Sequence, residues 1–234
     1  MSSETKVVIS LIVLTLIVIV GGIFLVSNQA ANTSGDVKID KAILIRPDSK
    51  QIVGNNSKVS IVEFADYECP SCAALYPNLK KLLSTDGDKI TFVYRNFLIH
   101  SGSMQAAVAA LAAGEQGKYW EMHDILFEKQ DEWSVAATDK DRGAFFEKYA
   151  TQIGLDIAKY KTDIANSKFT DMVNRDQTDG TSMHVSATPT IIINGTKLVV
   201  GSVSYDKLKQ IINDEIAGNN SNATVESGSS TKAR

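Results

Sequence analysis

The sequence has little cysteine and no excess of positive charge. Two cysteines occur in 234 residues, so a scaffold held together by many disulfides is excluded, because such a scaffold needs several cysteines spread along the chain. The formal net charge is −3, and no basic stripe or aromatic-interleaved cluster of lysines and arginines is present. Nucleic acid is therefore not an expected partner.

One long apolar run stands near the N-terminus. Residues 7–26 carry no charge, and a helix over this run would span roughly 30 Å, the thickness of a bilayer's hydrocarbon core. The run is longer than the apolar region of most cleavable signal peptides, and residues 28–31 make a poor cleavage site. We therefore expect an uncleaved transmembrane signal anchor at 7–26, with a cleaved signal peptide as the alternative.

The charges around this run give a weak signal for its orientation. Lysines lie on both sides of it, so the positive-inside rule decides little. The short flank at 1–6 suits an N-terminus in the cytoplasm. Residues 27–41 are polar and small and predict a linker, whereas 218–234 lack apolar periodicity and predict a disordered tail. One domain without internal repeats is expected between them, at 42–217.

The first half of this domain has the pattern of a βαβ unit. Residues 59–64 are rich in β-forming side chains and follow a Gly-Asn-Asn-Ser turn signal, and 89–97 have the same character. A helical pattern begins at Pro70 between them. Such a unit implies a parallel strand pair with a right-handed crossover.

The second half begins with a long stretch that contains helical patterns and no convincing strand. This stretch, about 101–183, predicts a helical insertion. Its helical patterns cover 104–114, 119–130, 145–152 and 156–167. Strands at 190–194 and 197–200 then flank Asn194-Gly195, a type I′ hairpin signal. A helix over 204–216 closes the domain.

The two cysteines form a Cys-Pro-Ser-Cys motif at the boundary between a strand and a helix. The spacing alone also suits half of a zinc site or two unreactive core thiols. The position favours a redox pair, because a helix N-terminus carries partial positive charge and unpaired N–H groups that stabilise a thiolate. Pro70 suits the first helical position, and the amides of Ser71 and Cys72 would then point toward the Cys69 sulfur.

These considerations give the two thiols different roles. Cys69 is expected to be the more exposed, attacking thiol, and Cys72 the buried thiol that resolves the mixed disulfide. A structural zinc site needs four nitrogen or sulfur ligands, and the three histidines show no ligand spacing. Neither a metal nor a cofactor is expected. Two of those histidines, His100 and His184, are interpreted as ordinary loop residues, with a position facing the active site as the alternative.

Three motifs in order resemble the DsbA-like branch of the thioredoxin superfamily over about residues 54–216. They are VSIVEFADYECPSC at 59–72, AGEQGKYWEMHD at 113–124 and TPTIIING at 188–195. The resemblance implies an α/β thioredoxin fold with an inserted all-helical subdomain. With the run at 7–26, it implies a membrane-anchored bacterial member of the family.

The resemblance also implies roles for residues around the cysteine motif. Pro189 matches the family's cis-proline beside the disulfide, where backbone groups can pair with a substrate chain. Thr188, Pro70 and Ser71 would belong to the same substrate-binding surface. From the sequence alone, an ordinary strand-starting proline stays open as the alternative for Pro189.

A glutamate before the motif matches a buried acid beneath the active site of thioredoxin-like proteins. Glu63 lies six residues before Cys69, on a strand whose alternation would half bury it and raise its pKa. It would then exchange protons with Cys72 during disulfide cleavage. An exposed edge-strand glutamate is the alternative.

Together these observations predict a membrane-anchored, single-pass thiol–disulfide oxidoreductase on the extracytoplasmic side, either periplasmic or extracellular. It would oxidise cysteine pairs of exported proteins and would need a membrane redox partner resembling the quinone-linked reoxidants. Strongly oxidising relatives carry a histidine where this chain has Ser71, which implies a milder oxidant. Fold does not fix function, so a reductase or isomerase fed with electrons across the membrane, and a non-catalytic tethered chaperone, stay open.

Overall fold

The computed structural model describes residues 39, 41–219 and 225–226 of the chain. No helix among these residues is both long enough and apolar enough to cross a bilayer. The predicted anchor at 7–26 and its flank at 1–6 lie outside the described residues, as does most of the predicted linker.

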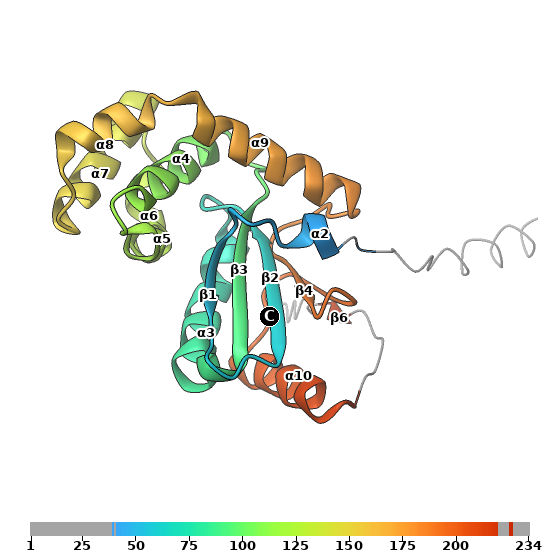
Figure 1. Cartoon of the computed structure of the whole chain (residues 1–234). Helices are drawn as coiled ribbons and strands as arrows, with labels where there is room; N and C mark the ends of the chain where they lie inside the picture. Colours follow the sequence, from blue (N-terminus) through green and yellow to red (C-terminus); the bar gives the residue numbers. More distant parts are fainter. Residues whose placement is uncertain (1–38, 40, 220–224, 227–234) are drawn as a thin grey trace, which may run out of the picture. The chain divides into compact units, whose positions relative to one another are not determined.

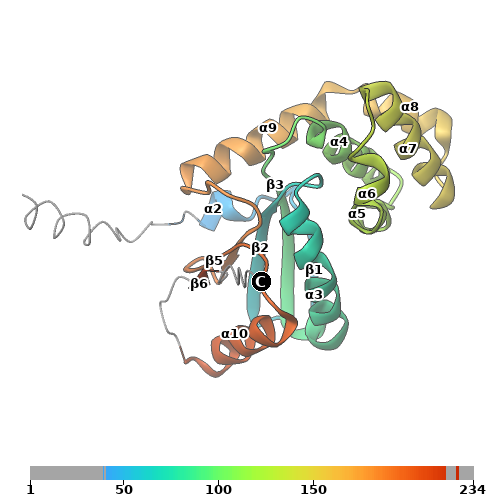
Figure 2. The same ribbon diagram turned by 180° about the vertical axis from the view of Figure 1, so that it is seen from behind.

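A mixed sheet forms the centre of the described part (Figure 1). Its strands, in spatial order, are β1 (Lys50–Val53), β3 (Ile90–Asn96), β2 (Val59–Ala65), β4 (Thr190–Ile193), β5 (Lys197–Val200) and β6 (Val225–Glu226). β2 and β3 pair in parallel, whereas β1 with β3, β2 with β4, and β4 with β5 are antiparallel. The rear view shows β5 and β6 on the opposite side of β2 from β1 (Figure 2). This arrangement confirms the thioredoxin fold.

Two helices cover one face of the sheet. The connection from β2 to β3 is α3 (Pro70–Asp86) with a short 3-10 turn, η1 (Gly87–Lys89), and α10 (Tyr205–Ala217) follows β5. Side chains from both helices, including Leu75 and Leu208, share one buried cluster with alternate residues of β2. A second cluster on the other face contains Val62 and Phe64 of β2 and Leu44 of the short helix α2 (Lys41–Leu44). β2 is therefore covered on both faces, as its nearly continuous apolar run predicts.

A block of helices occupies the chain between β3 and β4. The block consists of α4 (Ser103–Gly114), α5 (Tyr119–Glu128), α6 (Gln130–Trp133), α7 (Asp139–Gln152), α8 (Ile157–Ile164) and α9 (Ser167–Ser182). Figure 1 shows these helices gathered beyond one end of the strands. Within the block α4 is buried along most of its length, because its small alanine side chains let neighbouring helices approach closely.

Several elements differ from the sequence-based expectation. α7 begins at Asp139 rather than near 145, because the Thr138 side chain caps it by accepting the Asp141 N–H at 3.1 Å. α9 and β1 were not predicted, since few of their side chains are buried. β6 lies within the C-terminal segment whose composition predicts disorder, and its two residues pair with β5. The hairpin agrees with its signal, as Asn194 and Gly195 both have positive φ, 53° and 71°.

Candidate active site

The two cysteines lie at the start of α3, beneath the loop that precedes β4. Cys69 is the N-cap residue and Pro70 the first helical residue. The Cys69 carbonyl accepts the N–H groups of Cys72 and Ala73, each at 3.1 Å, so the first helical turn closes directly on the motif. Both thiols are free. Cys69 is 5% exposed and Cys72 is completely buried.

The surroundings of the two thiols shift their acidities in opposite directions. Hydrogen bonding from the Cys72 thiol lowers the pKa of Cys69 to about 5, against the opposing effect of burial. Thr188 and the backbone amides of Cys72 and Ser71 lower it further. Burial raises the pKa of Cys72, and its hydrogen bond to Cys69 and the nearby charge of Glu63 raise it further. Near neutral pH the first thiol is therefore a thiolate and the second keeps its proton.

The loop before β4 contributes the other wall of the site. The peptide bond between Thr188 and Pro189 is cis, and both residues are buried. The Cys69 thiol lies 3.5 Å from the Thr188 carbonyl oxygen and can donate to it. Pro70 and Ser71 follow Cys69 at the start of α3, where Pro70 is exposed and Ser71 is half-buried. The contact between Cys69 and Thr188 thus brings together the two segments that hold the four residues assigned to this surface.

Glu63 lies deeper, on the face of β2 that α3 covers. It is 2% exposed, and β2 runs between β3 and β4, so the alternative of an exposed edge-strand glutamate is wrong. Its carboxyl group has no hydrogen-bond partner among the described residues. Burial, and then the negative charge of Cys69, raises the pKa of Glu63 to about 8. At neutral pH this carboxyl group therefore holds a proton.

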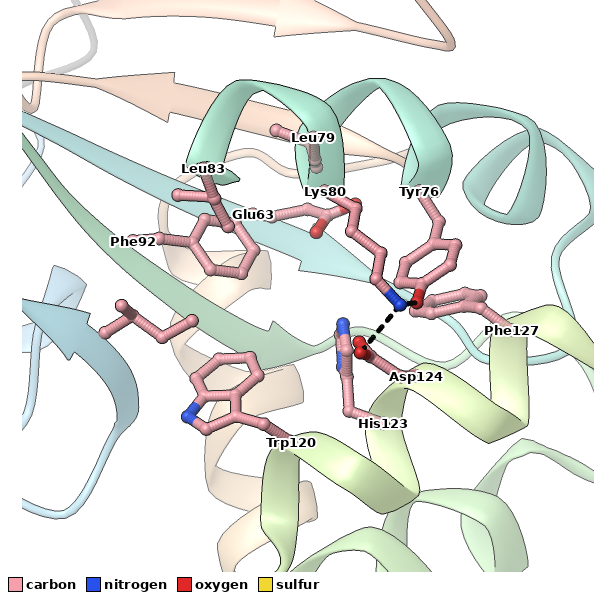
Figure 3. A pocket seen from close by; sticks show the side chains of 11 residues that line it. Glu63, Tyr76, Leu79, Lys80, Leu83, Phe92, Trp120, His123, Asp124 and Phe127 are labelled. Atoms are coloured by element: carbon pink, nitrogen blue, oxygen red, sulfur yellow. Dashed lines mark hydrogen bonds and ion pairs between the residues drawn. The ribbon is translucent and has the colours of Figure 1, made fainter. Parts of the chain in front are cut away.

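A cavity of about 140 Å³ is lined by Glu63 and by side chains of helices α3 and α5 (Figure 3). Lys80 lies at its rim, where it pairs with Asp124 at 2.9 Å and donates to the Tyr76 hydroxyl at 2.8 Å. The remaining walls are mostly apolar and aromatic: Ile52, Leu79, Leu83, Phe92, Trp120, His123 and Phe127. Burial, with a smaller effect of the Lys80 charge, lowers the pKa of His123 to about 3. Apart from the Lys80–Asp124 ion pair, the cavity therefore presents uncharged side chains to a buried acid.

Two buried residues that the sequence did not single out hold the segment leading into the motif. Asp66 is fully buried, and its carboxyl group accepts the Glu68 N–H at 2.7 Å and the Ser103 hydroxyl. Gln130 of α6 donates to the carbonyl oxygens of Tyr67 at 2.7 Å and Cys69 at 3.1 Å. An aspartate directly after a buried strand is a weak local signal. Nothing in the sequence near Gln130 indicates its contact.

Groups that bind metals are not gathered in this region. Within the described part of the chain, no set of three or more His, Cys, Asp or Glu side chains is placed to hold a metal ion.

Comparisons with known proteins agree with this architecture. A family model described as thioredoxin matches residues 48–214. Disulfide bond formation protein D of Bacillus subtilis is 31% identical over 175 residues, which cover 70% of this chain and 75% of that protein. The crystal structure of oxidised BdbD from Bacillus subtilis superposes with a TM-score of 0.63 and 26% identity, covering 73% of this chain and 94% of that one.

A second kind of relative shares the same region within a longer chain. The Na⁺/H⁺ antiporter NhaA 3 of Salinispora tropica is 33% identical over 163 residues, which are 68% of this chain and 24% of the antiporter. The chain thus spans about a quarter of the length of the antiporter relatives that it matches. The family expected from the three sequence motifs is confirmed by the family model and the Bacillus protein. The chain belongs to the DsbA-like family of thiol–disulfide oxidoreductases in the thioredoxin superfamily.

Proposed function

We propose that this protein exchanges disulfides with exported proteins outside the cytoplasmic membrane, and that it acts mainly as their oxidant. The observation that carries the proposal is the inequality of the two thiols: the pKa of Cys69 is lowered to about 5, and that of Cys72 is raised. A stabilised thiolate stabilises the reduced form of the pair, which makes the disulfide a stronger oxidant. The same thiolate is a good leaving group when a substrate is released.

In the oxidising direction, a substrate thiolate attacks the Cys69 sulfur of the Cys69–Cys72 disulfide. A mixed disulfide forms and Cys72 leaves as a thiolate, which takes up a proton. A second substrate thiolate then attacks the substrate sulfur of the mixed disulfide, and Cys69 leaves as a thiolate. Two electrons pass from the substrate to the cysteine pair. The substrate dithiol releases two protons, of which Cys72 retains one and solvent takes the other.

Glu63 is the proposed source of the proton that Cys72 takes up. Its pKa, raised to about 8, keeps it protonated at neutral pH, and once ionised its negative charge would raise the pKa of the Cys72 thiol, so the two groups are electrostatically coupled. A proton donor with a pKa near the working pH is effective in both directions of exchange. Glu63 would regain its proton through the adjoining cavity after the substrate leaves.

The surface around Cys69 is the proposed binding site for the substrate chain. The exposed Pro70 and the half-buried Ser71 follow Cys69 in α3, and the Thr188 carbonyl oxygen lies 3.5 Å from the Cys69 sulfur with Pro189 next to it. An extended segment of a substrate would lie between them, with its cysteine at Cys69. Partners of this kind are exported proteins that carry cysteine thiols or disulfides.

The charge-free run at 7–26 is the proposed membrane anchor, with residues 1–6 in the cytoplasm and the enzyme domain on the extracytoplasmic side. Each catalytic cycle leaves the cysteine pair reduced, so an acceptor of two electrons must restore the disulfide. We place that acceptor in the same membrane, as a partner resembling the quinone-linked reoxidants. The name of the Bacillus relative, disulfide bond formation protein D, supports the oxidising direction.

A trapping experiment tests the proposal. The Cys72→Ser variant should accumulate mixed disulfides with exported proteins through Cys69, because the resolving thiol is missing. The Cys69→Ser variant should accumulate none, because the remaining thiol is buried and protonated. Non-reducing electrophoresis of both full-length variants, expressed in cells, detects the adducts. No adducts with either variant would instead favour a tethered chaperone.

The direction of exchange is read from the wild-type protein in the same cells. Acid quenching followed by thiol alkylation preserves the redox state of the cysteine pair. A mainly oxidised pair supports the oxidase. A mainly reduced pair supports a reductase or isomerase and contradicts the oxidising direction.

A further inference from the structure

A histidine on a neighbouring loop is bound to Asp66, three residues before the attacking thiol. His100 lies between β3 and α4, and its N–H and ring Nδ1 each lie 3.0 Å from one oxygen of the buried Asp66 carboxyl group. The same oxygen accepts the N–H of Ile99 at 2.8 Å. Three donors from adjacent residues therefore fasten this loop to Asp66, and the ring has one orientation imposed on it.

The residue that holds His100 also holds the start of the cysteine motif. The Asp66 carbonyl oxygen accepts the N–H of Cys69 at 3.1 Å, while its side chain holds the histidine. The His100 side chain is 36% exposed, so its second ring nitrogen can exchange protons with solvent. The Asp66 hydrogen bond and charge raise the pKa of His100, against the effect of burial, and the charge of Cys69 raises it further. The ring is therefore within electrostatic range of the thiolate.

The other charged groups around this loop leave the ring in acidic surroundings. Glu68 accepts the N–H of Gly102 at 2.7 Å and adds a negative charge that raises the pKa of His100. On the other side Arg142 of α7 lies against Gly102, and its charge is paired with Asp139 at 2.7 Å. These negative charges favour the protonated form of the His100 imidazole.

We propose that His100 is a positioning residue whose protonated ring stabilises the Cys69 thiolate, so that the oxidising strength of the site falls as His100 loses its proton. The inference rests on the proposed function, because it concerns the same thiol. An opposite charge at short range lowers the pKa of a partner by one or more units when buried, and partial exposure of the ring reduces this to about half a unit to one unit. The oxidant would therefore be strongest in mildly acidic surroundings.

Thermodynamic linkage makes the proposal testable from the side of the histidine. If imidazolium stabilises the thiolate, the thiolate must raise the pKa of His100 by the same amount. Oxidation to the disulfide removes the negative charge. The pKa of His100 should therefore be about half a unit to one unit higher in the reduced protein than in the oxidised protein.

Histidine NMR of the wild-type full chain in detergent micelles measures this difference. The chain has three histidines, and the signal missing from a His100→Gln spectrum identifies the one concerned. His123, whose pKa burial lowers to about 3, should not titrate near neutral pH and serves as the internal reference. Equal His100 pKa values in the two redox states would overturn the proposal. The measurement needs no variant to be active.

Two substitutions separate the charge of His100 from its hydrogen bonds. His100→Gln keeps an N–H donor for Asp66 and removes the charge. It should raise the pKa of Cys69, followed by thiolate absorbance, by about half a unit to one unit. The equilibrium with glutathione should shift about three- to tenfold toward the disulfide form, and a tenfold shift equals about 30 mV. His100→Lys supplies a permanent charge and should restore the low Cys69 pKa.

The pH profile distinguishes an electrostatic role from a structural one. In the wild type, the glutathione equilibrium should show an inflection at the His100 pKa, and both variants should lack it. A lysine variant as impaired as the glutamine variant would contradict the electrostatic role. If Cys72→Ser traps substrates but the His100 pKa is the same in the reduced and oxidised protein, this inference fails and the proposed function stands. Absence of trapped substrates overturns the proposed function instead.

Discussion

The two faces of the β2–β3 strand pair differ in whether a buried ionisable side chain has hydrogen-bond partners. Toward α9, Arg95 of β3 is fully buried and donates to Asp176 at 2.6 Å and Asp179 at 2.5 Å. Toward α3, Glu63 of β2 is buried beside Tyr94 with no hydrogen-bond partner among the described residues. Neighbouring positions on the strands separate the two sites, because side chains alternate between faces along a strand.

The difference indicates what each site is for. Arg95 also donates to the carbonyl oxygens of Ile43 and Leu44 at 2.7 and 2.8 Å, so one guanidinium joins β3, α9 and the segment before β1. Such a satisfied network contributes to a single arrangement of the fold. The isolated carboxyl of Glu63 costs stability once it ionises, and this cost is typical of groups retained for chemistry.

Removing Arg95 and its hydrogen bonds should have the largest effect on the free energy of unfolding. Arg95→Met leaves Asp176 buried without its arginine partner and Asp179 with Arg46 alone, which should lower the free energy of unfolding by about 3–5 kcal/mol. Urea unfolding of the full chain in micelles, followed by fluorescence of the two tryptophans, measures the loss. The matched control is Arg175→Met, which breaks an exposed pair with Asp48 and should cost at most about 1 kcal/mol. Equal losses in the two variants would contradict the comparison.

Replacing Glu63, the isolated buried acid, should raise the free energy of unfolding at high pH, whereas the Arg95 substitution should lower it. The pKa of Glu63 rises on folding from 4.5 to about 8, so stability present below pH 4.5 is lost as the pH rises through about 8. Glu63→Gln should therefore match the wild type at pH 4 and exceed its free energy of unfolding at pH 9 by roughly 3 kcal/mol. The oxidised protein serves for this measurement, because burial, the larger cause of the shift, persists without the Cys69 charge.

The same substitution should slow exchange although it stabilises the fold. Without a proton donor for Cys72, the rate of single-turnover oxidation of a reduced peptide should fall by about 10²-fold or more.

A lower free energy of unfolding for Glu63→Gln than for the wild type at pH 9 would contradict the stability prediction, because it would show that Glu63 is not an isolated buried acid.

The smallest expected effect on stability concerns Asp179, one of the two carboxyl groups that pair with Arg95. Although burial opposes it, hydrogen bonds from Arg46 and Arg95 lower the pKa of Asp179, so its contribution is present above its unfolded pKa and is lost as the pH falls through its folded value. Asp179→Asn should cost about 1–2 kcal/mol at pH 7. The difference from the wild type should shrink as the pH falls below the unfolded value of 3.8. A difference that is independent of pH would mean that the charge of Asp179 contributes nothing.

The sequence predicted the elements whose signals are local. The β-rich run at 59–64 gave β2 within one residue, and Asn194-Gly195 gave the hairpin with its two positive φ values. α9 was missed because it buries few apolar side chains and holds its place through polar contacts such as Asp179 with Arg95. Such contacts depend on a partner far away in the chain, and no periodicity reports them.

The residues of the candidate site likewise divide into those that the sequence indicated and one that it did not. Cys69 and Cys72 follow from a motif at a helix start, and Glu63 and Pro189 follow from a resemblance that covers the whole domain. His100 was interpreted as an ordinary loop residue. Its significance depends on a contact with Asp66 across 34 positions, which only the folded chain brings about.

The contact of Gln130 with the Tyr67 and Cys69 carbonyls bears on how such proteins can change over time. In the sequence, the helical block is an insertion between β3 and β4 that could be exchanged as a unit. Through this one amide it is part of the frame that holds the reactive sulfur. A transplanted or shortened block would have to bring an equivalent donor to the same spot. Any change to these helices that removes the Gln130 amide would therefore leave the Tyr67 and Cys69 carbonyl oxygens without this donor.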